Sequence, residues 1–193
     1  MPNWCYCSYT IIGDEKELND LFEKMQSLED REESLVENGF GKTWLGNLVT
    51  LLGGNWKDVS CRGEWFDLEK GQDCLRFNVQ SAWSEPYEVN AFLAKKFPNL
   101  GIYFLAKESG MSYYVTNDTT GAVYDVRYRL TKDSTEEVYD FMDGEEERLF
   151  ATVSELIGKD VSSFDECQEA IQQYNDNNDW EDWIEIEHYV IAE

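Results

Sequence analysis

The sequence predicts an α+β protein: a ferredoxin-like antiparallel sheet with helices on one face, plus an acidic α/β extension at the C-terminus. Segments of period two, typical of strands, alternate with segments of helical period. Their order is strand, helix, small helix, strand, strand, helix, strand, then two more strands. Two βαβ-like halves in this order describe a sheet with its helices on one face. The charge balance then changes sharply after residue 132.

The first strand and the first helix have the clearest pattern. Apolar residues at alternate positions predict a strand over residues 4–12, which Gly13 ends. Asp14 is followed three residues later by Glu17, a spacing that predicts a reciprocal cap at a helix start. Leucine, phenylalanine and methionine then recur at helical spacing, so we expect an amphipathic helix over residues 15–29.

A short helix and a hairpin are predicted next. Residues 44–52 fit a short helix closed by Gly53 and Gly54, with a strand as the alternative. Residues 59–68 and 74–83 read as two strands joined by a turn that contains Gly71.

A second helix and three strands complete the first region. Ser84 is expected to cap this helix, with Pro86 in its first turn, and Pro98 prevents its continuation. Strands are then predicted over residues 102–106, 111–116 and 123–130.

The last third of the chain is far more acidic than the rest. Residues 1–132 hold 20 acidic and 14 basic side chains, whereas residues 133–193 hold 20 and 2, a net charge of −18. Apolar stripes predict helices over residues 145–157 and 163–174 and a final strand over residues 184–190. We therefore expect an α+β domain over residues 1–132 and a folded acidic extension over residues 133–193 that docks on it.

The net charge of −24 limits the partners of this chain. Such a surface repels phosphate backbones and anionic membranes, so no direct nucleic-acid or membrane binding is expected, and a basic protein is the favoured partner. No secretory signal is evident, and no apolar window approaches the roughly 20 residues that span a bilayer. A cytoplasmic location is expected, and the oligomeric state is left open.

No catalytic or cofactor-binding pattern stands out. His188 is the only histidine, and apolar residues two positions away on both sides favour a packed strand residue over a catalytic base. Cys5 and Cys7 have the spacing of same-face strand residues and no Cys-x-x-Cys pair exists, so reduced, mostly buried thiols are favoured over a zinc site. We predict no catalytic residue, cofactor or metal, and expect that the protein is not an enzyme.

The acidic run near the C-terminus is the candidate interaction surface. It contains two tryptophans beside dense carboxylates, and exposed aromatic residues are typical of protein-binding hot spots. The alternatives are a solvated loop, simple packing of the final strand, or a weak cation site, although Glu181 stands where a calcium loop needs glycine. The predicted surface comprises Asp176, Asp179, Trp180, Glu181, Asp182 and Trp183.

Four short segments carry a resemblance to a known family. They are Pro2-Asn3-Trp4-Cys5, Trp44-Leu45-Gly46-Asn47, Cys61-Arg62-Gly63-Glu64 and Trp83-Ser84-Glu85-Pro86. Over about residues 1–130 the chain resembles the YubB ferredoxin-like proteins, which are encoded mostly by phages, plasmids and other bacterial mobile elements. The resemblance implies a fold and a mobile-element setting, but no activity. Within these segments, Arg62 is expected to pair with Glu64 or another acid, and most tryptophans are expected in the core or on sheet faces.

The function predicted from these observations is a non-enzymatic, acidic protein-interaction module that engages a basic partner. A sharper form is a nucleic-acid mimic that occupies the DNA-binding groove of a host protein. A divalent-cation-binding protein or enzyme that uses carboxylates is the alternative from another class. The charge could also serve only solubility.

Overall fold

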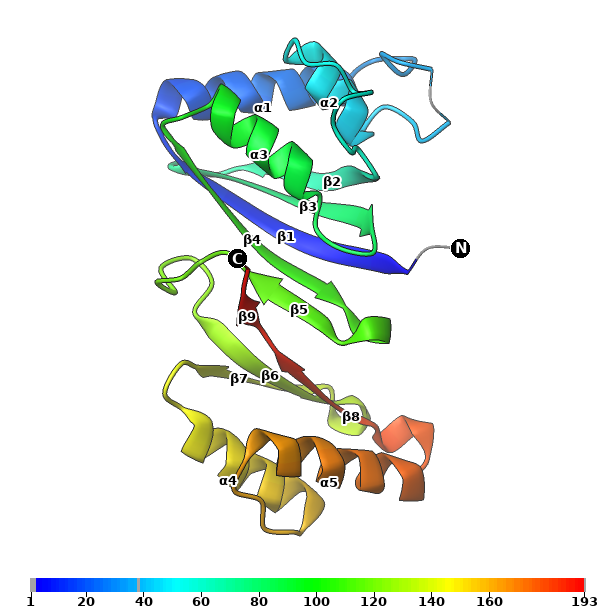
Figure 1. Cartoon of the computed structure of the whole chain (residues 1–193), viewed down its shortest axis with the longest axis vertical. Helices are drawn as coiled ribbons and strands as arrows, with labels where there is room; N and C mark the ends of the chain where they lie inside the picture. Colours follow the sequence, from blue (N-terminus) through cyan, green and yellow to red (C-terminus); the bar gives the residue numbers. More distant parts are fainter. Residues whose placement is uncertain (1–2, 38, 193) are drawn as a thin grey trace. The chain divides into compact units, whose positions relative to one another are not determined.

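The computed structural model describes residues 3–37 and 39–192 (Figure 1). The chain divides into two compact units, residues 1–117 (unit 1) and residues 118–193 (unit 2). Each unit combines an antiparallel sheet with helices, which confirms the α+β class. Among the described residues, no helix has both the length and the apolar character needed to cross a bilayer.

Unit 1 is built on an antiparallel sheet with β1 near its centre. The strand order is β2-β3-β1-β4-β5, and every neighbouring pair is antiparallel. In this register Tyr9 lies opposite Phe77 on one side and Phe104 on the other. The strands are β1 (Trp4–Gly13), β2 (Gly63–Lys70), β3 (Cys74–Ala82), β4 (Leu100–Glu108) and β5 (Tyr113–Thr116).

Three α-helices lie on one side of this sheet (Figure 1). They are α1 (Glu15–Glu29), α2 (Leu45–Leu51) and α3 (Tyr87–Lys96), and a short helix η1 (Ser109–Met111) joins β4 to β5. The buried face of β1 begins with Cys5 and Cys7 and continues with Tyr9, whose ring stacks on Phe77 at a centroid distance of 5.0 Å. The Tyr9 hydroxyl donates to Asn90 Oδ1 of α3 (2.9 Å), so the one buried polar group of this ring is satisfied.

The first helix begins as predicted, but only half of the expected cap forms. Asp14 Oδ1 accepts a hydrogen bond from the Glu17 N–H (3.0 Å). The predicted reciprocal bond, from the Asp14 N–H to the Glu17 carboxylate, does not form. The Asp14 N–H donates to the Asn99 carbonyl, and the Glu17 carboxylate accepts from the Asn99 N–H and Nδ2 instead. Gly13 permits this approach, since a Cβ there would lie 2.2 Å from the Asn99 oxygen.

The predicted cap of α3 is also wrong. The helix begins at Tyr87, after Pro86, and no side chain caps it. The Ser84 hydroxyl donates to the Glu85 carbonyl (3.3 Å). Ser84 therefore belongs to the turn between β3 and α3.

Unit 2 pairs a small sheet with two helices. Its strand order is β7-β6-β8, both pairs antiparallel. The elements are β6 (Val126–Lys132), η2 (Asp133–Thr135), β7 (Glu137–Met142), α4 (Glu146–Ile157), α5 (Phe164–Asn177), η3 (Trp180–Asp182), β8 (Ile184–His188) and β9 (Val190–Ile191). Its core consists of Leu130, Phe141, Leu149, Val153, Cys167, Ile171 and Ile184.

The division between the units differs from the predicted change at residue 132. The last strand assigned to the first domain, β6, pairs with β7 and β8, and its Leu130 is fully buried in the core of unit 2. The pattern gave no sign of β7, because Phe141 is its only fully buried residue and its exposed positions carry Val138 and Met142 beside acids.

Candidate functional site

The predicted surface forms one segment of unit 2, which we call the acidic turn (residues 176–183). Asp176, Asp179 and Glu181 are exposed, and Trp183 is 41% exposed. The side chain of Trp180 lies outside the described part of the structure. Three carboxylates and one indole of the predicted set therefore face solvent.

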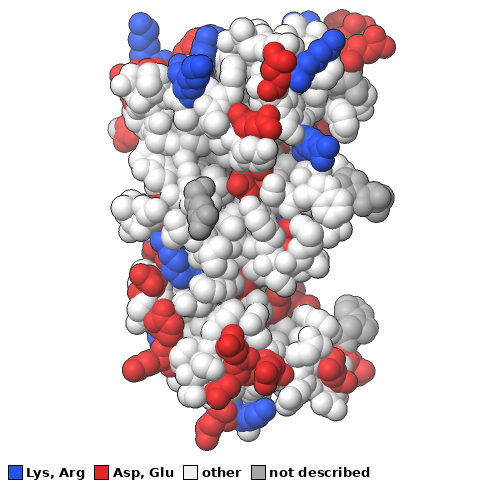
Figure 2. Space-filling view, in the orientation of Figure 1, with Lys and Arg blue, Asp and Glu red and all other residues white. Residues whose placement is uncertain are grey.

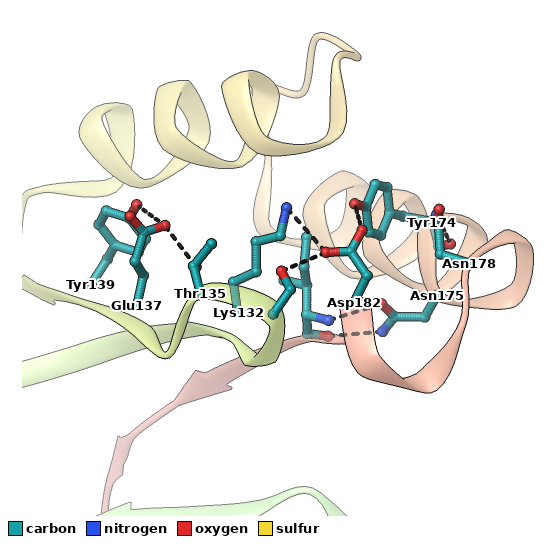
Figure 3. Close-up of polar contacts among 10 residues, drawn as sticks. Lys132, Thr135, Glu137, Tyr139, Tyr174, Asn175, Asn178 and Asp182 are labelled. Atoms are coloured by element: carbon teal, nitrogen blue, oxygen red, sulfur yellow. Dashed lines mark hydrogen bonds and ion pairs between the residues drawn. The ribbon is translucent and has the colours of Figure 1, made fainter.

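Asp182, by contrast, is tied into the fold (Figure 3). Its carboxylate accepts hydrogen bonds from Ser134 Oγ (2.6 Å) and the Tyr174 hydroxyl, and pairs with Lys132 Nζ at 3.2 Å. The bonds from Ser134 and Tyr174, followed by Lys132, lower the pKa of Asp182 to about 2. Asp182 thus joins η3 to η2, to the end of β6 and to α5, which is a structural role.

A buried asparagine closes the same turn. Asn175 Nδ2 donates to the Ile184 carbonyl (2.8 Å), and Asn175 Oδ1 accepts from the Ile184 N–H (2.9 Å; Figure 3). One side chain therefore satisfies both main-chain groups at the start of β8, where the chain leaves the acidic turn.

The single histidine also has a structural surrounding. His188 stacks on Tyr128 at a centroid distance of 4.5 Å and contacts Phe164 at 4.9 Å. Burial lowers the pKa of His188, although Glu146 acts in the opposite direction. The packed strand residue that the sequence favours is confirmed.

A different set of residues converges in unit 1, where a pocket of about 470 Å³ opens. The walls come from the starts of β1 and β2, the end of β3, and the loops on either side of α2. Its lining is mainly aromatic, with two charged side chains, and we call it the tryptophan pocket. It is lined by Trp4, Phe40, Trp44, Trp56, Ser60, Cys61, Arg62, Gly63, Glu64, Gln80, Ala82 and Trp83.

Trp44 is the buried wall of this pocket. It immediately precedes α2, and its ring lies over the main chain of Gly46, where a Cβ would come within 2.3 Å of the indole. Its Nε1–H donates to the Cys61 carbonyl (2.6 Å). Burial raises the pKa of the Cys61 thiol to about 11, so the pocket wall carries a neutral thiol at neutral pH.

Asn47 holds the loop before α2. It is fully buried, and its Nδ2 donates to Ser34 Oγ (2.8 Å) and to the carbonyls of Gly41 and Lys42 (both 2.9 Å). Its Oδ1 accepts from the Val36 N–H (3.0 Å). One amide therefore satisfies several main-chain groups of a loop that has no regular structure of its own.

The loop held by Asn47 completes a row of rings. Phe40 stacks on Trp44 at a centroid distance of 6.2 Å and an angle of 20°. Trp56 meets the edge of Trp44 at 5.3 Å and 68°. These are the offset and edge-to-face arrangements that aromatic quadrupoles favour.

Trp4 and Trp83 form the exposed rim, with 39% and 43% of their surfaces accessible. Trp4 lies opposite Ala82 in the β1–β3 pair, and the Trp83 N–H donates to the Asn3 carbonyl (2.9 Å). Trp83 has a φ of +75°, which is a strained conformation for a bulky residue and costs about 1–3 kcal/mol. The fold thus holds an indole at the rim in a backbone conformation that glycine or asparagine would adopt more easily.

The two charged side chains of the pocket are not used by the fold. Arg62 is exposed and Glu64 half-buried, on either side of Gly63, whose Cβ would lie 2.5 Å from the Gln80 carbonyl. The predicted ion pair of Arg62 is wrong, because within residues 3–37 and 39–192 no carboxylate pairs with it. No described side chain or main-chain N–H donates a hydrogen bond to the Glu64 carboxylate either.

A smaller, more polar pocket of about 310 Å³ adjoins the first. Arg62 and Trp83 belong to the lining of both, so they separate the two hollows. The smaller pocket adds Glu85, which accepts a hydrogen bond from the Tyr113 hydroxyl. The larger pocket therefore offers mainly aromatic faces, and the smaller pocket offers the oxygen atoms of serine and glutamate side chains.

Sequence reasoning missed the tryptophan pocket, although its parts were noticed. Each of the four segments that carry the family resemblance contributes to the lining, through Trp4, Trp44, the run 61–64, or Trp83. Of the tryptophans predicted for the core or a sheet face, Trp65 is fully buried, whereas Trp83 lies at the rim. The available signal was the recurrence of tryptophan in three of the four segments.

No family model, curated protein or solved structure matches this chain.

All five cysteines are free thiols and four are buried, as predicted. Within the part of the chain that the structure describes, no three histidine, cysteine, aspartate or glutamate side chains are grouped as metal ligands.

Proposed function

We propose that this chain is a non-enzymatic protein-interaction module for a basic partner, with the tryptophan pocket of unit 1 as its principal contact. The observation that carries the proposal is the pocket itself. Tryptophan and arginine dominate the binding energy of protein interfaces, and the pocket presents Trp4, Trp83 and Arg62 at its rim. Trp83 is held there at a cost in backbone strain, as residues at functional sites often are.

The charge of the chain supports a basic partner. Unit 1 holds 18 acidic and 11 basic side chains, and unit 2 holds 22 and 5, a net charge of −17. Figure 2 shows carboxylates spread over the visible face of unit 2 with few cations among them, whereas both signs occur over unit 1. Such a field speeds the approach of a cationic protein and disfavours anionic ones.

Unit 1 in this proposal is a ferredoxin-like domain, and unit 2 is its acidic extension. The element order β1-α1-β2-β3-α3-β4, with β1 between β3 and β4, supports this assignment. The resemblance of the four tryptophan-pocket segments to the YubB proteins supports a bacterial mobile element as the setting. A protein of the bacterial host, or of the element itself, is then the natural partner.

The test is affinity capture from bacterial lysate at about 50 mM and about 500 mM salt, since salt screens exposed charges. Two single variants are compared with the wild type, Trp83→Asn in the tryptophan pocket and Trp183→Asn in the acidic turn. The two indoles are similarly exposed, at 43% and 41%, and asparagine tolerates the positive φ of position 83. We expect a basic protein that the wild type and Trp183→Asn capture, that Trp83→Asn loses, and that high salt weakens.

Two outcomes contradict the proposal. One is capture of no basic protein by the wild type at either salt concentration. The other is a partner that Trp83→Asn retains and Trp183→Asn loses, which moves the contact to the acidic turn. If that partner binds DNA and duplex DNA displaces it, the nucleic-acid mimic replaces the present proposal.

A further inference from the structure

We infer that the tryptophan pocket takes an arginine side chain of the partner protein, through cation–π contacts with its indoles and an ion pair with Glu64. This inference rests on the proposed function, because it names the group that the module binds. It follows from the chemistry of the lining, the surroundings of Glu64 and the charge of the chain.

The aromatic lining favours a cation. The negative face of an indole ring attracts an ammonium or guanidinium group more strongly than the ring face of tyrosine or phenylalanine does. Four indoles and Phe40 line the pocket, and one of them already binds a cation within the chain, since Lys57 Nζ lies 5.6 Å from the centre of the Trp56 ring. A volume of about 470 Å³ leaves room for a flat guanidinium among these rings.

Glu64 distinguishes a cation from a neutral apolar anchor. Its carboxylate is half-buried in the lining, and none of the described groups donates a hydrogen bond to it. A neutral ring that filled the pocket would displace water from this carboxylate without replacing the lost hydrogen bonds, which is unfavourable. A guanidinium replaces the lost water with paired N–H donors and a positive charge.

Arg62 in the lining and Lys57 beside Trp56 are the opposing charges, and the exposure of both side chains limits their effect. The Arg62 side chain is exposed at the boundary of the two pockets, where water and salt screen it. An anion drawn to Arg62 would meet Glu64 and a chain of net charge −24. Arginine is preferred to lysine because the guanidinium is planar, weakly hydrated and able to stack on an indole face.

The probes are two capped tripeptides, Gly-Arg-Gly and Gly-citrulline-Gly, which differ only in the charge of nearly isosteric side chains. Each is titrated into the full chain, and the indole N–H resonances of the tryptophans are followed by NMR. We expect the arginine peptide to bind at least about tenfold more tightly than the citrulline peptide. The shifts should be confined to Trp4, Trp56, Trp83 and Trp44, and spare Trp183.

Two charge variants of the lining give effects of opposite sign. Glu64→Gln should weaken arginine binding about tenfold, whereas Arg62→Gln should strengthen it about twofold. Among the described residues neither side chain has a hydrogen-bond or ion-pair partner, so unchanged amide spectra are expected for both variants and exclude unfolding as the cause. A capped Gly-Lys-Gly peptide is expected to bind between the arginine and citrulline peptides.

Equal affinity for arginine and citrulline, an unchanged affinity in Glu64→Gln, or shifts outside the tryptophan pocket would overturn the inference. These results leave the proposed function standing, because that depends on the loss of a captured partner in Trp83→Asn. Tighter binding of the lysine peptide would overturn the choice of arginine.

Discussion

The tryptophan pocket of unit 1 and the acidic turn of unit 2 use similar residues in opposite ways. Both place tryptophan beside charged side chains. In the acidic turn these residues are neighbours in sequence, and the least exposed carboxylate, Asp182, is bound to Ser134, Tyr174 and Lys132. In the pocket they come from distant segments, and no group in residues 3–37 or 39–192 pairs with the charge of Arg62 or Glu64. A dense run of charge in the sequence therefore contains a carboxylate that the fold itself uses, whereas residues scattered along the sequence form the pocket that we propose as the binding site.

The two regions share one device, a buried asparagine that hydrogen-bonds main-chain groups. Asn47 holds the loop at the pocket wall through four hydrogen bonds. Asn175 holds the exit of the acidic turn through two. The number of hydrogen bonds predicts how much free energy of unfolding each region loses when its asparagine amide is removed.

The largest effect is expected from Asn47→Ala. Removal of the amide breaks the four hydrogen bonds that Asn47 makes to the loop, so the free energy of unfolding of unit 1 should fall by about 3 kcal/mol. Urea unfolding followed by tryptophan fluorescence measures it. The control is Asn55→Ala, an exposed asparagine that hydrogen-bonds only the Lys57 N–H and the Asp58 carboxylate of its own turn among the described residues, with an expected change below about 1 kcal/mol. A loss as small as the control's would mean that the loop does not need Asn47.

Asn175→Ala should have a smaller effect, in unit 2. Two main-chain groups of Ile184 lose their partners, and the expected loss is about 2 kcal/mol. Exposed Asn177, whose side chain donates to the Gln173 carbonyl, supplies the matched control Asn177→Ala. Hydrogen exchange of β8 amides reports the local effect. If Asn175→Ala costs more than Asn47→Ala, the count of bonds is not what sets the dependence.

Asp182 predicts a pH dependence that belongs to the acidic turn alone. Its pKa is lowered from 3.8 to about 2, so the folded state favours the carboxylate and stabilises unit 2 above pH 4. This contribution should be lost as the pH falls from about 4 to about 2, because the unfolded chain then binds a proton first. Unfolding curves of the wild type and Asp182→Asn should therefore converge over that range. Ser134→Ala removes the hydrogen bond that lowers the Asp182 pKa most, so it should reduce the stability difference between Asp182 and Asp182→Asn proteins at neutral pH. If the stabilities of the wild type and Asp182→Asn differ by the same amount at every pH, the role assigned to the Asp182 carboxylate is contradicted.

The smallest effect is expected from the exposed carboxylates. A triple variant, Asp176→Asn, Asp179→Asn and Glu181→Gln, should change the free energy of unfolding of unit 2 by less than about 0.5 kcal/mol. Thermal unfolding at low and high salt measures it. A large loss would show that the turn depends on all its carboxylates, and the contrast with Asp182 would disappear.

The elements formed by local pattern were predicted well. Helix α1 spans the predicted residues 15–29, β1 covers the predicted 4–12 with Gly13 added, and the short helix predicted for residues 44–52 is confirmed by α2. Both signals are local, because alternation and helical spacing depend on neighbours in sequence. The second half of the Asp14 cap failed because Asn99 competes for the same groups.

The missed strand pairing and the missed pocket concern residues that meet across long distances in sequence. Strand β6 was assigned to the first domain, and β7 was missed. The alternation of apolar residues within a strand does not show which other strands it pairs with. The pocket was missed for the same reason. Trp4, Trp44 and Trp83 each look like packing residues alone, and only the pairing of Trp4 with Ala82 and the bond from Trp44 to Cys61 bring them together.

The sequence by itself determined the α+β class, most helices and strands, and the net charge of −24, because periodicity and net charge are sums over the chain. Only the tertiary structure decided which tryptophans face a cavity, that Asp182 is bound within the fold, and that no described group pairs with Arg62 or Glu64 in the pocket. The physical reason is that hydrogen bonds and desolvation depend on distances of a few ångströms between residues that the chain order keeps far apart.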